Sequence, residues 1–157
     1  MDIPTVDIAT LPNNVQNIFA WLHHSTKTIV EQGDEVTPIL FADIGGGQIT
    51  YTPLTEMMTD GAKKDIVAQL IEDMAHKEGV KFVAFVSEAW ALRMNGGEEP
   101  DSISDHPNRT EIVMYNVRIG NQQFMASADI SRDPNVLGSL QVTALELKGR
   151  FAKPVLQ

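Results

Sequence analysis

Two stretches of the chain place apolar residues three and four positions apart, which is the spacing of one face of an α-helix. The first stripe consists of Val15, Ile18, Phe19, Leu22, Thr26 and Ile29. It predicts a helix over residues 13–32, which Gly33 closes. The second stripe consists of Ile66, Val67, Leu70, Ile71 and Met74. It predicts a helix over residues 62–78, and both stripes require an apolar surface to cover them.

The other apolar segments are short and rich in β-branched residues, which is typical of β-strands. Strands are expected at residues 36–42, 48–52, 80–91, 109–119, 122–131 and 139–148. Three glycines at 45–47 and the pair Gly120-Asn121 mark the turns of two hairpins. Pro38 has no N–H to donate, which favours an edge position for the first strand. Residues 82–86 are apolar throughout, which predicts a central strand covered on both faces.

The order of these elements is helix, two strands, helix and then four strands. Runs of strands without helices between them predict an α+β fold. We expect a mainly antiparallel sheet of about five or six strands, with two amphipathic helices packed on one face. The 157 residues form one domain of ordinary size, with an extended lead-in at 1–10 and a loose tail at 149–157. A polar surface loop is expected between Arg93 and Asn108.

The charge balance excludes several classes of partner. Acidic residues number 21 and basic residues 12, which gives a net charge of −9. Nucleic acids and anionic membranes both attract clustered Lys and Arg, so we expect neither as a partner. No apolar run is long enough to span a membrane, and no signal peptide is recognisable, so we expect a cytoplasmic protein. If a phage encodes it, the location is the host cytoplasm.

The sequence also narrows the chemistry. With no cysteine, the chain has neither a thiolate nucleophile nor Cys-ligated zinc. It contains no phosphate-binding loop and no hydrolase or metalloprotease motif. We therefore expect no cofactor and no bound metal. Glu72 and His76, four residues apart on the second helix, can touch, and a solvated helix face is favoured there over a weak metal site.

The most unusual segment is Ser87-Glu88-Ala89-Trp90, which ends an apolar strand with a carboxylate and an indole. Strand alternation places Glu88 on the same face as Val86 and Trp90. A carboxylate in an apolar row needs a partner, because an unpaired buried charge costs several kcal/mol. In one interpretation Glu88 is a general base or a ligand. In the other, which we favour, an arginine or the loop binds it at the sheet edge.

A second polar segment, His106-Pro107-Asn108-Arg109-Thr110-Glu111, opens the next strand. If the two strands are neighbours, His106, Arg109 and Glu111 approach Glu88. Histidine with two carboxylates can bind a metal or carry out acid–base catalysis. The same residues can instead hold a long loop against the sheet, and we favour this structural role.

The two segments together, Ser87-Glu88-Ala89-Trp90 and His106-Pro107-x-Arg109-x-Glu111, resemble a pattern in small bacterial and phage proteins of unknown function. The resemblance covers about residues 80–130, and a loop rich in Gly, Glu and Pro separates its two halves. It implies a bacterial or phage source. It implies no particular activity.

Two hypotheses about function follow. The favoured one is a non-catalytic binding or assembly protein that associates with itself through a sheet edge, or with an unknown protein partner. The strand at 139–148 is the expected edge, and a symmetric dimer is the expected form. The alternative is a small hydrolase-like enzyme, in which Glu88 and His106 act on a substrate that Arg109 clamps.

Overall fold

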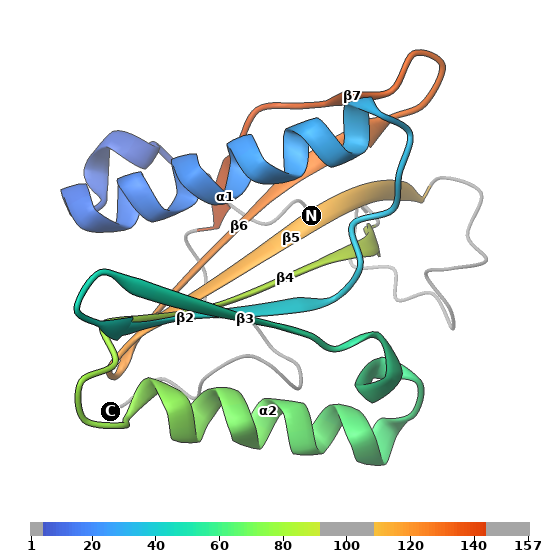
Figure 1. Cartoon of the computed structure of the whole chain (residues 1–157). Coiled ribbons are helices and arrows are strands. Elements are labelled where there is room, and N and C mark those ends of the chain that lie inside the picture. The colour runs from blue at the N-terminus through green and yellow to red at the C-terminus, as the bar shows by residue number, and fades with distance from the viewer. Residues whose placement is uncertain (1–4, 92–108, 144–157) are drawn as a thin grey trace, which may run out of the picture. The chain divides into compact units, whose positions relative to one another are not determined.

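The computed structural model describes residues 5–91 and 109–143 (Figure 1). Its helices are η1 (Ile8–Thr10), α1 (Asn13–Glu31), η2 (Thr55–Met58) and α2 (Gly61–Ala75), where η marks a 3-10 helix. Its strands are β1 (Thr5–Val6), β2 (Ile39–Gly45), β3 (Gln48–Pro53), β4 (Phe82–Ala91), β5 (Thr110–Ile119), β6 (Gln122–Ser131), β7 (Val136–Leu137) and β8 (Gln141–Thr143). Two amphipathic helices and an antiparallel sheet confirm the α+β class.

The sheet has the strand order β1-β8-β6-β5-β4-β2-β3, and β7 pairs with β6. β4 therefore lies inside the sheet between β5 and β2, as its apolar sequence predicts. β2 is also an interior strand, so the edge position predicted from Pro38 is wrong. β2 begins at Ile39, the residue after Pro38, so the position without an N–H lies just before the first residue of the strand. The Pro38 carbonyl there accepts a hydrogen bond from Leu54 N–H (2.8 Å).

β8 was also predicted to be an edge strand and also lies between two other strands. β8 lies between β6 and β1, and Val142 is paired with Ala126 on one side and with Val6 on the other. Both edges of Gln141–Thr143 are therefore occupied, so the part of the predicted 139–148 strand that the structure describes is not a free edge; residues 144–148 lie outside the described residues. The covering strand comes from the lead-in at 1–10, where the sequence showed no strand pattern. The tail at 149–157 lies outside the described residues.

The chain forms two compact parts. Of the described residues, the first comprises 5–36, 88–91, 109–114 and 126–143. Of the described residues, the second comprises Thr37–Ser87 and Tyr115–Met125. α1 belongs to the first part and α2 to the second. That both helices cover the same face of the sheet stays a prediction.

In the first part, α1 buries one continuous face. Its buried residues are Val15, Phe19, Leu22, Thr26 and Val30, which follow the predicted stripe closely. α1 runs alongside β7 (Figure 1). The His23 ring lies against the segment after β7, with Nε2 2.8 Å from the Gly138 carbonyl oxygen.

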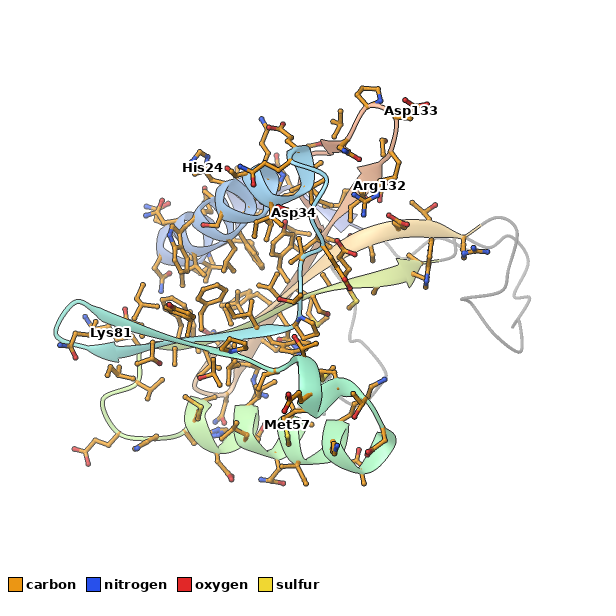
Figure 2. All side chains as sticks on the ribbon, turned by 45° about the vertical axis from the view of Figure 1, so that its right-hand side comes forward. His24, Asp34, Met57, Lys81, Arg132 and Asp133 are labelled. Atoms are coloured by element: carbon orange, nitrogen blue, oxygen red, sulfur yellow. The ribbon has the colours of Figure 1, made fainter. Side chains whose placement is uncertain are left out.

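In the second part, α2 covers one face of β2 and β4. The core between them consists of Leu40, Ala42, Leu54, Val67, Ile71, Ala75, Val83 and Phe85. Met57 of η2 also packs against this core, and Figure 2 shows it lying over α2. The buried stripe of α2 is narrower than predicted, because Ile66 is 59% exposed and Leu70 is 39% exposed.

Two isoleucines of α2 provide a matched test of this packing. Ile71 is 3% exposed, so Ile71→Ala leaves a cavity and should lower the free energy of unfolding by about 3 kcal/mol. Ile66→Ala should change it by less than about 1 kcal/mol, because that side chain is already largely in water. Urea denaturation of the two variants measures the difference. Equal losses would contradict the orientation of α2.

Candidate functional site

The carboxylate of Glu88 is engaged by two groups of the first compact part. Val36 N–H donates to Oε1 at 2.9 Å. Arg132 Nη2 lies 3.7 Å from the same oxygen. Because Val36 is 2% exposed, Glu88 supplies an acceptor to a backbone group that water reaches poorly. Glu88 thereby fastens the segment that follows α1 to β4.

Arg132 connects Glu88 to a second carboxylate. Its Nε donates to Glu111 Oε2 at 2.9 Å. Figure 2 shows Arg132 just after the end of β6, beside Asp133. The three side chains are partly exposed, at 38% for Arg132, 21% for Glu88 and 31% for Glu111. One cation between two carboxylates forms a compact ion-pair cluster that joins β4, β5 and the end of β6.

Arg109 is engaged elsewhere in the same part of the molecule. Its guanidinium carbon lies 4.5 Å from the centroid of the Trp90 ring, which is the geometry of a cation–π contact. Trp90 is 40% exposed, so this contact lies at the surface.

The structure therefore brings together part of the predicted set. β4 and β5 are neighbours, as expected, and Glu88 and Glu111 share one arginine. That arginine is Arg132, which sequence reasoning missed, whereas Arg109 stacks on Trp90. His106 lies outside the described residues, so its approach to Glu88 stays a prediction.

The register of the β5–β6 hairpin, followed residue by residue from its turn, could have brought Arg132 into view. The turn is Gly120-Asn121, and a two-residue turn puts Ile119 opposite Gln122. Continuing that count places residue 132 beside residue 109, one pleat from Glu111.

The second compact part holds a polar cluster of its own. Arg118, on β5, is 3% exposed, and its Nη2 donates to Glu72 Oε2 at 2.7 Å. Its Nε has no hydrogen-bond partner among the described residues. His76 lies 3.5 Å from Glu72 Oε1 through Nδ1, and its Nε2 lies 2.7 Å from Asn121 Oδ1. Glu72 and His76 do touch, as their spacing predicts, but Glu72 also neutralises a buried arginine.

The outer edge of β3 is the third feature, and it is free of charge. All six residues of β3 are exposed, and no other described strand pairs with its outer side. The sequence is Gln-Ile-Thr-Tyr-Thr-Pro. Tyr51 is 68% exposed and Ile49 is 44% exposed. In register they lie opposite Phe41 and Asp43, so they point away from the face that α2 covers.

The hydrogen-bond pattern shows which backbone groups of β3 point outward. Leu54 N–H donates to Pro38 O, which lies directly opposite it in the register of β2 and β3. In an antiparallel pair such bonded positions alternate with positions whose groups point away. Thr50 and Thr52 therefore bond to β2, and Ile49 and Tyr51 direct N–H and C=O outward. We call these two residues with Thr50 between them the open edge.

No protein-family model matches the chain, and no curated protein or solved structure shows significant similarity to it. Among residues 5–91 and 109–143, no three His, Asp or Glu side chains converge to hold a metal ion. Within the same residues, no helix combines the length and the apolar character needed to cross a membrane.

Replacing Glu88 tests its role as a backbone acceptor. Glu88→Ala leaves Val36 N–H unpaired and should lower the free energy of unfolding by about 2 kcal/mol. Glu88→Gln keeps an acceptor oxygen and loses only the partly exposed ion pair, so we expect about 0.5–1 kcal/mol. Urea denaturation measures both, with the exposed neighbour Glu35→Ala as the control. Equal losses for the Ala and Gln variants would show that the N–H bond contributes nothing.

Arg118 gives a second stability prediction. Glu72→Ala removes the partner of a buried cation and should cost about 2 kcal/mol. Asp73→Ala, on the exposed side of the same helix, should cost about 0.5 kcal/mol or less. Thermal unfolding followed by circular dichroism compares the two. The double variant Glu72→Met with Arg118→Met should regain stability, because no charge is left buried; a further loss would contradict this account.

Proposed function

We propose that the chain is a non-catalytic binding or assembly protein whose contact surface is the open edge of β3. The supporting observation is a six-residue edge strand, fully exposed and without a charged residue. An edge strand offers unpaired N–H and C=O groups to any other strand. Proteins that stay apart commonly protect such edges with lysine, inward-pointing charges or a covering loop. Among the described residues, Pro53 at the last position of β3 is the only such device.

The polar clusters give less support to catalysis. A hydrolase built on Glu88, His106 and Arg109 needs these groups around one open position. Glu88 Oε1 already accepts from Val36 N–H and lies near Arg132, and Arg109 covers Trp90. These contacts favour a structural role for Glu88. The hydrolase stays the alternative, and it depends on His106.

The proposed setting follows from the charge. A chain with a net charge of −9 suits neither nucleic acid nor an anionic membrane, so the expected partner is a protein. We place the protein in the cytoplasm, or in the host cytoplasm if a phage encodes it.

A charge introduced on the open edge tests the proposal. Wild-type protein should associate as its concentration rises through the micromolar range, and Tyr51→Lys should abolish this, because burying a lysine at a strand edge is unfavourable. Ile66→Lys is the matched control, since it introduces the same charge at a similarly exposed position on α2. Sedimentation velocity and light scattering measure the mass. A wild-type monomer at every concentration, or equal association of Tyr51→Lys, would contradict the proposal.

A further inference from the structure

We infer that the open edge of β3 pairs with the open edge of a second copy, antiparallel, about a two-fold axis through Thr50. This inference rests on the proposed function, which is tested by self-association, and adds the strand orientation and the register. In that register Ile49 lies opposite the partner's Tyr51, and Thr50 lies opposite its own counterpart.

The backbone groups of the open edge are complementary in this register. Ile49 and Tyr51 both direct N–H and C=O outward, so each can exchange two hydrogen bonds with the other in the partner. The two symmetric pairs make about four hydrogen bonds and use every outward group of both residues. The backbone N–H and C=O of Thr50 point to β2, so the central Thr50–Thr50 pair of the dimer is a non-hydrogen-bonded pair.

A shift of the axis to Tyr51 is less favourable. It would place Ile49 opposite the partner's Pro53, which has no N–H. The carbonyl of Ile49 would then lack a donor in both copies. The position of Pro53 therefore favours Thr50 over Tyr51 as the centre.

The side chains agree with the same register. Ile49 and Tyr51 point to one face, so each symmetric pair sets a β-branched residue against an aromatic one, a favourable cross-strand combination. Two threonines meet at the centre of the other face, with Gln48 opposite the partner's Thr52. No charged residue opposes another, because β3 carries none.

The net charge predicts how salt acts on this contact. Each copy carries −9, so two copies repel one another, while the uncharged edge has no ion pair for salt to weaken. Raising the ionic strength from about 0.01 M to about 0.15 M should therefore strengthen association. Weakening by salt would indicate a contact built on ion pairs and would contradict the inference.

Disulfide crosslinking of single-cysteine variants tests the register directly. The chain has no cysteine of its own, so each variant carries one thiol. In Thr50→Cys the two thiols of a dimer face one another at a Cα separation of about 4.5 Å, which a disulfide spans. In Thr52→Cys they lie about 13 Å apart along the strands, which is too far. Both threonines are exposed and point to the same face, so the variants are matched.

We expect mild oxidation of full-length Thr50→Cys to give a disulfide-linked dimer, and Thr52→Cys to remain uncrosslinked, on non-reducing gels. Adding Tyr51→Lys to Thr50→Cys should abolish the crosslink, which separates specific pairing from random collision. A crosslink in Thr52→Cys, or only in a mixture of the two variants, overturns the register. Absence of any crosslink, while wild type still associates and Tyr51→Lys does not, overturns the inference and leaves the proposed function standing. A wild-type monomer overturns both.

Discussion

Every backbone N–H and C=O removed from water needs a hydrogen-bond partner, and the whole structure is arranged around this constraint. The interior strands satisfy it on both sides through the order β1-β8-β6-β5-β4-β2-β3. Val36 lies in no strand, and a side chain, Glu88, satisfies its N–H. The outer side of β3 has no partner among the described residues. The same requirement thus accounts for the sheet, for the most unusual carboxylate and for the surface most suited to a contact.

The two arginine clusters show how charge is handled next to this sheet. Arg132 is partly exposed and lies between two carboxylates, so its contribution to stability is modest. Arg118 is buried, and its carboxylate partner within residues 5–91 and 109–143 is Glu72, so its contribution depends on Glu72. Both bind strands to neighbouring elements.

Much of the fold could be predicted from local pattern, because α1 and α2 carry a helical period and β4 begins with a continuous apolar run. The very short β1 and β7 could not, since two residues carry no period. The place of Glu88 in an apolar row indicated that this carboxylate needs a partner, but it did not identify Arg132. Arg132 lies 44 positions away in the chain, and only the hairpin register connects it to Glu111. Ile66 and Leu70 were assigned to the buried stripe because periodicity gives a helix face and not the width of the surface covering it.

The composition of β3 strengthens the argument from its geometry. The chain has 33 charged residues among 157, and none lies in β3. Strand propensity by itself favours Ile, Thr and Tyr over charged residues at these positions. An approaching strand adds a second reason, because a charge at the edge would have to lose its water. Ile49 and Tyr51 carry both the outward backbone groups and the exposed apolar side chains, so the features that a second strand would recognise occur on the same two residues.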